Sequence, residues 1–119
     1  MKIKSSSNEP LRGEIWLLDL SPTIGHEQSA LRPALVISED IFNSGPAGLV
    51  ITCPITSKNR QIRAHLEVLP PEGGLAMPSY IMTEQVRTVS KNRLIRKTGR
   101  VSVATMEEVE DKLRIIVGL

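Results

Sequence analysis

The chain is divided into short apolar runs, and proline, glycine or a polar cluster follows each run within a few residues. Such runs are too short for ordinary helices, and their isoleucine and valine content favours strands. Only the last segment, after Ser102, changes to a helical period. This order of elements predicts a mainly β fold with one C-terminal helix, in which the strands form a small barrel or a strongly bent antiparallel sheet.

Five or six strands are expected, with turns between them. They cover residues 14–20, 32–38, 49–53, 64–69, 79–83 and 94–101, and residues 85–89 either continue the fifth strand or turn away from it. Pro54 is expected to end the third strand, because proline cannot donate a hydrogen bond to a neighbouring strand. We expect a loop or one helical turn over residues 39–45 and a turn over residues 70–74.

The C-terminal segment has the pattern of an amphipathic helix. Its apolar residues recur at helical spacing, at Met106, Val109, Leu113, Ile116 and Val117. Ser102 is expected to cap the first turn. Acidic residues gather near the start and basic residues lie further along, which agrees with the helix dipole.

Length and composition suit one compact domain. The chain has 119 residues, of which 40% are hydrophobic. We assign residues 10–119 to this domain and residues 1–9, which are polar, to a mobile tail. No apolar run approaches the length of a transmembrane helix, and the polar start does not resemble a secretory signal. Cys53 is the single cysteine, which excludes an internal disulfide and favours a reducing cytoplasm.

Charge is unevenly distributed along the chain, although the net charge is only +2. Basic residues gather at Lys58, Arg60 and Arg63, and again over residues 91–100, while acidic residues gather over residues 107–111. This asymmetry has two readings, a basic face that recruits an anionic partner or an ordinary charge-balanced surface.

The sequence offers no recognisable metal or cofactor site. His26, His65 and Cys53 are the possible soft ligands, and their spacing matches no zinc pattern. No glycine-rich phosphate loop is present, and the carboxylates are not grouped to hold magnesium ions. We therefore expect no metal and no cofactor. His65 is interpreted as an ordinary surface or edge residue, and Cys53, Trp16 and Phe42 as core.

The segment between the first two predicted strands carries the densest polar chemistry. Gly25-His26-Glu27-Gln28 is followed closely by Arg32-Pro33. An imidazole, a carboxylate, a carboxamide and a guanidinium are groups that transfer protons and bind phosphate. A loop with this content on a small scaffold is typical of a functional site.

Several segments of the chain resemble the MazF/PemK (Kid) toxins of bacterial toxin–antitoxin systems. They occur in the family's order over roughly residues 10–119, and they are residues 12–16, 22–28, 32–38, 54–57, 84–88 and the closing helix. The resemblance implies an SH3-like barrel of the CcdB/PemK type with a C-terminal helix, working as a homodimer. It also implies a sequence-specific, metal-independent endoribonuclease that cleaves single-stranded RNA (mRNA) and leaves 2′,3′-cyclic phosphate and 5′-hydroxyl ends. Inhibition by a cognate MazE-like antitoxin is also implied, and its C-terminal segment, acidic and disordered until bound, is expected to cover the RNA groove.

RNA cleavage without a metal needs a base, an acid and a fixed positive charge at the phosphate. Arg32 is the candidate for the charge, because a guanidinium is permanently charged and can engage two phosphate oxygens. It matches the family's essential arginine. Thr56 matches the family's catalytic-site threonine, and its hydroxyl suits a hydrogen bond to the scissile phosphate better than proton abstraction.

The acid and base remain open between several groups. Glu27 could act as the base if burial raises its pKa, and His26 has an intrinsic pKa near neutrality. Glu84 matches an aspartate that serves as the base in the Kid-like branch, or it could simply orient Arg87 by charge pairing. The arginine that serves as the acid in that branch is replaced here by Met82, which cannot donate a proton.

Positioning of the RNA is assigned to amides, hydroxyls and cations around these groups. The residues are Gln28, Ser57, Lys58, Arg60, Gln85 and Arg87. The resemblance implies that the loops over residues 24–31 and 58–63 set the recognised sequence.

Two other functions fit the same fold. CcdB toxins share the barrel and poison gyrase through a C-terminal Trp-Gly-Ile. This chain ends Val117-Gly118-Leu119, without the anchoring tryptophan. A non-catalytic binding module that kept the fold and lost the reaction is the second alternative, and Met82 is the feature that favours it.

Overall fold

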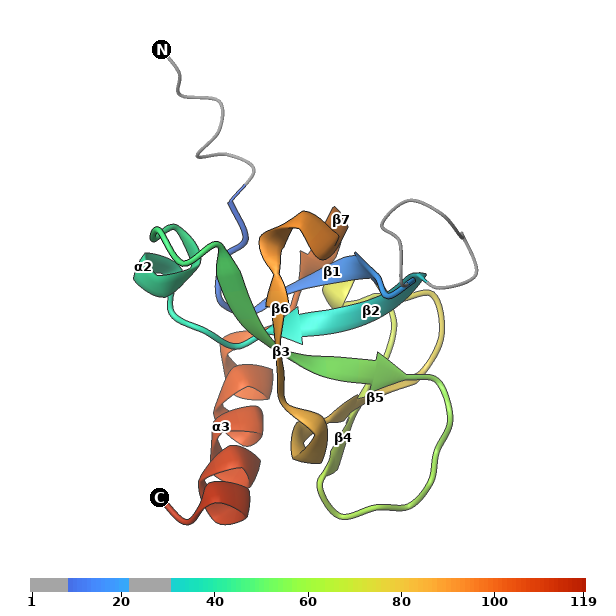
Figure 1. Cartoon of the computed structure of the whole chain (residues 1–119). Coiled ribbons are helices and arrows are strands. Elements are labelled where there is room, and N and C mark those ends of the chain that lie inside the picture. Colours follow the sequence, from blue (N-terminus) through green and yellow to red (C-terminus); the bar gives the residue numbers. More distant parts are fainter. Residues whose placement is uncertain (1–8, 22–30) are drawn as a thin grey trace.

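The computed structural model describes residues 9–21 and 31–119 and contains a bent antiparallel sheet with a C-terminal helix (Figure 1). The strands are β1 (Glu14–Asp19), β2 (Leu31–Val36), β3 (Leu49–Thr56), β4 (His65–Val68), β5 (Ser79–Met82), β6 (Arg87–Ser90) and β7 (Leu94–Arg100). The helices are α2 (Asp40–Asn43) and α3 (Val103–Val117), and three short 3-10 turns are η2 (Glu72–Gly74), η3 (Thr83–Gln85) and η4 (Lys91–Arg93). The predicted fold class is confirmed.

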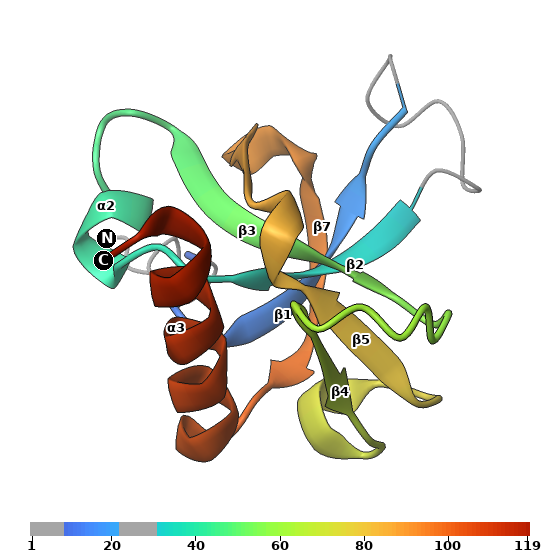
Figure 2. The same ribbon diagram turned by 90° about the horizontal axis from the view of Figure 1, so that it is seen from below.

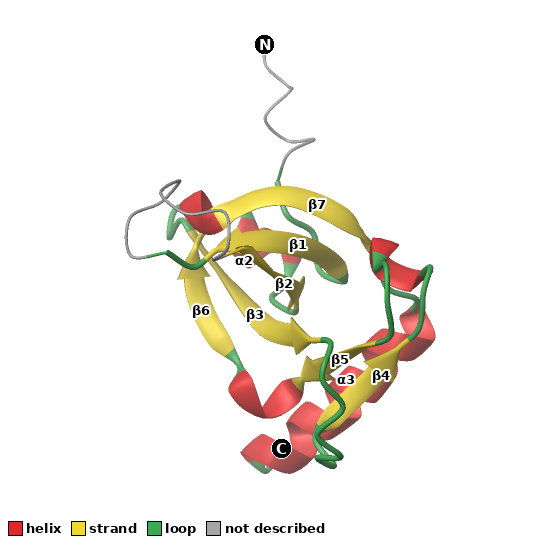
Figure 3. Cartoon of the chain, turned by 90° about the vertical axis from the view of Figure 1, so that its right-hand side faces the viewer, coloured by secondary structure: helices red, strands yellow, loops and turns green. Residues whose placement is uncertain are grey.

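The strands form one sheet in the order β4-β5-β3-β2-β1-β7, with β6 also paired to β3. All pairs are antiparallel. Figure 3 shows how strongly the sheet bends, with β1, β2, β3 and β6 curving around a common interior. This curvature brings the ends of strands that are distant in the sequence to the same side of the molecule.

β3 is the strand that joins the two parts of the sheet. Its first half pairs with β6, its centre with β2 up to the Ala34–Pro54 pair, and its last two residues with β5. The prediction that Pro54 ends this strand is therefore wrong. Proline is tolerated because it stands where β3 leaves one partner and joins the next, and a missing donor costs least at such a junction.

The chain turns away from β5 after Met82, so the second alternative for residues 85–89 is the correct one. The 3-10 turn η3 redirects the backbone, and β6 then pairs with the first half of β3. The strand β6 is therefore separate from β5, a division that the sequence pattern did not show. The turn η3 between them carries Glu84 and Gln85.

The helix α3 begins where the sequence predicts. The Ser102 side chain accepts a hydrogen bond from the Thr105 backbone N–H, and Gly118 ends the helix in the left-handed conformation. Met106 and Val109 are buried against the sheet, and Figure 2 shows α3 lying along one side of the strands. None of the helices in the described ranges is long and apolar enough to cross a membrane.

The core lies between the sheet and α3. Its buried members are Ile15, Leu35, Cys53, Ile55, Val68, Ile81, Val101, Met106 and Val109. A smaller cluster, formed by Leu18, Ala34, Val50 and Val89, fills the other end of the sheet. Burying apolar surface of this kind supplies the main driving force for folding.

The prediction that Phe42 belongs to the core is wrong, since its relative exposure is 37%. The buried residue of α2 is Asn43, which is fully covered and donates through Nδ2 to the carbonyls of Pro10 and Ser38. Polar bonds therefore hold this single turn in place, and Phe42 faces outwards. Trp16 is half-buried, and its indole N–H donates to Glu14 Oε1 at 3.0 Å.

Candidate active site

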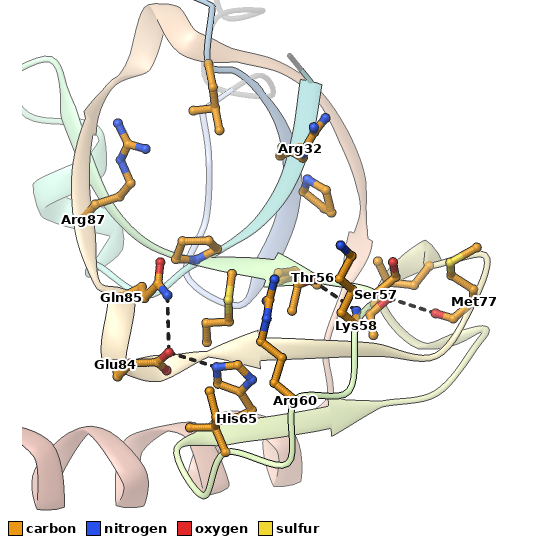
Figure 4. Close-up of a pocket in the computed structure, with 18 of the residues that line it drawn as sticks. Arg32, Thr56, Ser57, Lys58, Arg60, His65, Met77, Glu84, Gln85 and Arg87 are labelled. Atoms are coloured by element: carbon orange, nitrogen blue, oxygen red, sulfur yellow. Dashed lines mark hydrogen bonds and ion pairs between the residues drawn. The ribbon is translucent and has the colours of Figure 1, made fainter. Parts of the chain in front are cut away.

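A groove of about 890 Å³ opens where the ends of β2 and β3 meet the turn η3 and the loop before β4 (Figure 4). Its lining is partly polar and partly apolar. The predicted site residues that line it are Arg32, Thr56, Ser57, Lys58, Arg60, Glu84, Gln85 and Arg87. The fold thus gathers residues from three separate stretches of the chain around one cavity.

Four cationic side chains surround this groove. Arg32 lies on β2 and Arg87 on β6, on opposite sides of the cavity in Figure 4, and Lys58 and Arg60 lie on the loop between β3 and β4. Arg32 Nη1 donates to the Leu31 carbonyl at 2.8 Å. Within the described residues, Lys58, Arg60 and Arg87 form no ion pair with a carboxylate. The groove is therefore suited to an anionic ligand.

Thr56 stands at the end of β3, on the floor of the groove. Its Oγ1 accepts a hydrogen bond from the Lys58 backbone N–H at 3.2 Å, which fixes the start of the following loop. A hydroxyl that accepts through one lone pair still has its hydrogen to donate. Thr56 can therefore hold the loop and donate to a phosphate oxygen at the same time.

Glu84 lies on η3 and is hydrogen-bonded on two sides. Its Oε2 accepts from His65 Nε2 at 2.9 Å and from Gln85 Nε2 at 3.4 Å. Burial alone would raise the pKa of Glu84, but the hydrogen bonds, led by that from His65, outweigh it and hold the pKa below its ordinary value. No ion pair joins Glu84 to Arg87 in the described part of the chain, so the suggestion that Glu84 orients Arg87 is wrong.

His65 lines the groove, a position that the sequence did not predict. The edge reading of this residue is confirmed, because β4 is an edge strand of the sheet, but the surface reading is wrong, because the side chain is only 4% exposed. Its position at the start of β4 opposite Met82 of β5 brings the ring next to Glu84. Only the pairing register of β4 and β5 could have signalled this contact.

The sequence has recognised relatives over almost its whole length. Residues 11–117 match the family of PemK-like, MazF-like toxins of type II toxin–antitoxin systems. The chain belongs to this family. It is 37% identical to the endoribonuclease MazF of Staphylococcus saprophyticus (91% of each chain) and 34% identical to the endoribonuclease EndoA of Bacillus subtilis (91% of this chain, 94% of EndoA). A solved mycobacterial endoribonuclease in complex with its cognate antitoxin is 25% identical, with a TM-score of 0.74 over 94% of this chain and 96% of the other.

In this PemK/MazF-family chain the lining of the groove also includes apolar side chains. They are leucine, isoleucine, proline and methionine residues, among them Leu20, Pro33, Pro54, Ile62, Leu75, Met77 and Met82. Such side chains can contact the flat face of a nucleobase without aromatic stacking. Met82, which replaces the Kid-like acid, is 8% exposed and therefore mainly contributes packing.

Three of the predicted site residues, His26, Glu27 and Gln28, lie outside the described residues. The segment that carries them spans residues 22–30. Leu20 and Arg32, which lie close to its two ends, both line the groove. Within residues 9–21 and 31–119, no three histidine, cysteine or acidic side chains are grouped so that they could hold a metal ion.

The second basic cluster, over residues 91–100, has a structural role. Lys91 Nζ binds Glu9 at 2.7 Å, and Lys97 Nζ binds Glu14 at 3.3 Å. Arg93 donates to the backbone carbonyls of Asp19 and Ser21. The charge-balanced reading therefore holds for Lys91 and Lys97, whereas Lys58 and Arg60 of the first cluster line the groove.

Proposed function

We propose that this PemK/MazF-family chain is a sequence-specific endoribonuclease that cleaves single-stranded RNA, such as mRNA, without a metal ion. The observation that carries the proposal is the groove in which Arg32, Thr56 and Glu84 lie among further cations. Two relatives that share about a third of this sequence are named endoribonucleases, which supports the same activity here.

The reaction is a transesterification at phosphorus. The 2′-hydroxyl loses its proton to a base and its oxygen attacks the adjacent phosphate, while the 5′-oxygen leaves and receives a proton from an acid. Arg32 compensates the negative charge that grows on the phosphate oxygens, and the Thr56 hydroxyl donates to one of them. The products are a 2′,3′-cyclic phosphate and a 5′-hydroxyl.

The candidates for the base are Glu27, His26 and Glu84. The hydrogen bonds that lower the pKa of Glu84 keep it ionised near neutral pH, so it can accept a proton but is a weak base. Arg32 or His26 is left as the acid, because Met82 has no proton to donate.

The RNA strand runs along the cationic rim of the groove in this proposal. Lys58, Arg60 and Arg87 neutralise phosphates, while Ser57, Gln28 and Gln85 form hydrogen bonds to bases or sugar. Backbone phosphates provide affinity, and contacts to base edges provide the sequence preference.

The proposed toxin domain covers residues 10–119 and acts in the cytoplasm, where a MazE-like antitoxin neutralises it. The mycobacterial relative was solved with its cognate antitoxin, which supports a partner of this kind. An acidic segment of such a partner would compete with RNA for the same cations.

We further propose that the working form is a homodimer. One chain has a mass of 13.1 kDa. Sedimentation of the purified chain at micromolar concentration is expected to give about twice that mass. Apolar side chains are exposed near the end of α3, among them Ile115 and Leu119, and two chains could bury this surface by associating. A monomer at that concentration contradicts the proposal.

The activity itself is tested by incubating the purified chain with a long unstructured RNA in EDTA and mapping the new ends. Cleavage at a recurring short sequence is the expected result, with a 2′,3′-cyclic phosphate at the 3′ end of the upstream fragment and a 5′-hydroxyl on the downstream fragment. Intact RNA across a sequence-diverse substrate would contradict the proposed function, and a DNA supercoiling assay would then test the gyrase alternative.

A further inference from the structure

Three side chains in the groove form a continuous hydrogen-bonded row. His65 Nε2 lies 2.9 Å from Glu84 Oε2, and the same oxygen lies 3.4 Å from Gln85 Nε2 (Figure 4). The row begins at a side chain that is 4% exposed, and it ends at the exposed carboxamide of Gln85, which lines the groove. A buried group is therefore connected, through Glu84, to an exposed group that can contact a ligand in the groove.

The central carboxylate gives this row a direction. An ionised carboxylate can only accept hydrogen bonds, so it selects the amide nitrogen of Gln85 and repels the amide oxygen. The Gln85 carboxamide consequently has one fixed orientation, with its oxygen turned away from Glu84. It then presents one acceptor and one remaining N–H donor, side by side.

His65 is held firmly enough to anchor the row. Its backbone N–H donates to the Ile62 carbonyl at 2.9 Å, and Thr83 Oγ1 donates to the Ala64 carbonyl at 2.7 Å, so that η3 is fastened to the start of β4. The second ring nitrogen, Nδ1, is buried and has no hydrogen-bond partner among the described residues. The bond to Glu84 is thus the ring's polar anchor within that part of the chain.

We propose that His65 is a positioning residue for base recognition: through Glu84 it fixes the Gln85 carboxamide as an oriented donor–acceptor pair that reads one nucleobase of the RNA. The inference rests on the proposed endoribonuclease function and adds a specificity role to that site. Paired donor and acceptor contacts from a carboxamide are a common means of reading a base edge.

Loss of the anchor has a defined consequence. Without the His65 donor, Glu84 can rotate about its own side-chain bonds, and the Gln85 amide can turn over. A carboxamide that samples both orientations presents its hydrogen-bond donor and acceptor to the base in either order. Discrimination at one RNA position then falls, while the phosphate contacts from Lys58, Arg60 and Arg87 keep the general affinity.

Binding to an uncleavable RNA separates this role from chemistry. The probe is a short RNA carrying the mapped cleavage sequence, with a 2′-deoxy sugar at the cut, together with a set in which each base is changed singly. Fluorescence anisotropy gives the affinity of every probe for the wild-type chain and for the Glu84→Gln, His65→Phe and His65→Gln variants. Arg96→Ala, an exposed change on β7 away from the groove, is the control.

Glu84→Gln is expected to reduce discrimination at one position by about tenfold, the value of one paired base contact, because a carboxamide at position 84 can face either end of Gln85. His65→Phe keeps the ring volume without the donor and is expected to reduce discrimination at the same position. His65→Gln, which restores an N–H near the place of Nε2, is expected to recover it.

The proposal is overturned if Glu84→Gln binds all probes with the wild-type pattern, or if affinity falls equally for every probe. The Glu84 side chain is partly exposed, so Glu84→Gln is expected to fold. This variant therefore tests the proposal even if His65→Phe fails to fold. Failure of the wild-type chain to cleave RNA in EDTA would remove the proposed function and this inference together. Cleavage with unaltered discrimination in the variants removes the inference alone.

Discussion

The reactivity of Cys53 in solution follows mainly from its burial. It lies at the centre of β3 with no exposed surface. Burial, with a smaller contribution from the Glu84 charge, raises its pKa to about 12. The thiolate is the reactive form, so we expect the folded chain to resist a thiol reagent such as DTNB at pH 8 and the denatured chain to react completely. Rapid labelling of the native chain would contradict the burial of Cys53.

At the residue scale, the sequence was informative where chemistry alone singles out a side chain. Arg32, Thr56 and the cations Lys58 and Arg60 were predicted from residue type and family motif, and the fold brings them to one groove. His65 could not be recognised in this way. Its importance depends on which residue of another strand lies opposite, and strand pairing is not encoded locally in one sequence.

At the scale of elements, the turn η2 is tied to the start of α3 through Glu72. Its Oε2 accepts from the Ser102 backbone N–H at 2.9 Å and from Thr105 Oγ1 at 2.6 Å. Burial alone would raise the Glu72 pKa, but these hydrogen bonds outweigh it and lower the pKa below its ordinary value of 4.5. The charged carboxylate therefore stabilises the folded chain.

The lowered pKa of Glu72 determines the pH range over which its carboxylate stabilises the folded chain. Because the folded-state pKa is lowered, the stabilisation is complete above pH 4.5 and is lost as the pH falls through the folded-state value. We expect Glu72→Gln to lower the free energy of unfolding at pH 7 by about 0.5 kcal/mol, a small value because solvent screens a partly exposed carboxylate. The difference from wild type should shrink steadily below pH 4.5.

Urea denaturation of both chains between pH 7 and pH 3 measures this difference. Glu108→Gln, an exposed change on α3, is the matched control and should show no comparable pH-dependent gap. A Glu72→Gln gap that stays constant or widens in acid would show that the carboxylate is not the stabilising form.

The elements themselves were largely predictable from the sequence, and the exceptions have one physical cause. The period of the apolar residues indicated α3 and the strands other than β6, and Ser102 marked the helix start. Pro54 was misread because its tolerance depends on β3 changing partners at that residue. The separation of β6 from β5 depends likewise on a pairing with β3.

For the whole molecule, the arrangement of charge is more informative than its sum. The net charge is +2, yet four cations line the groove: Arg32, Lys58, Arg60 and Arg87. Neutralised phosphates on a single strand each contribute about −0.7 to the slope of log affinity against log salt concentration. We therefore expect a slope of about −3 for binding of an uncleavable single-stranded RNA.

Single substitutions show how much each cation contributes to this slope of log affinity against log salt concentration. Arg60→Gln is expected to reduce its magnitude by about 0.7, and Arg96→Gln on β7 to leave it unchanged. Anisotropy titrations between low and physiological salt provide the measurement. Equal slopes for the wild-type and Arg60→Gln chains would place the RNA away from this groove.

If RNA is cleaved in the groove around Arg32, as proposed, removal of this guanidinium should abolish cleavage without unfolding the chain. Wild-type, Arg32→Ala and Arg96→Ala chains are incubated with the same RNA in EDTA, and their melting temperatures are compared. Arg32 is exposed, so its loss should leave the melting temperature nearly unchanged while the cleavage rate falls by at least about a hundredfold. Cleavage at the wild-type rate by a folded Arg32→Ala chain would show that Arg32 takes no part in the reaction.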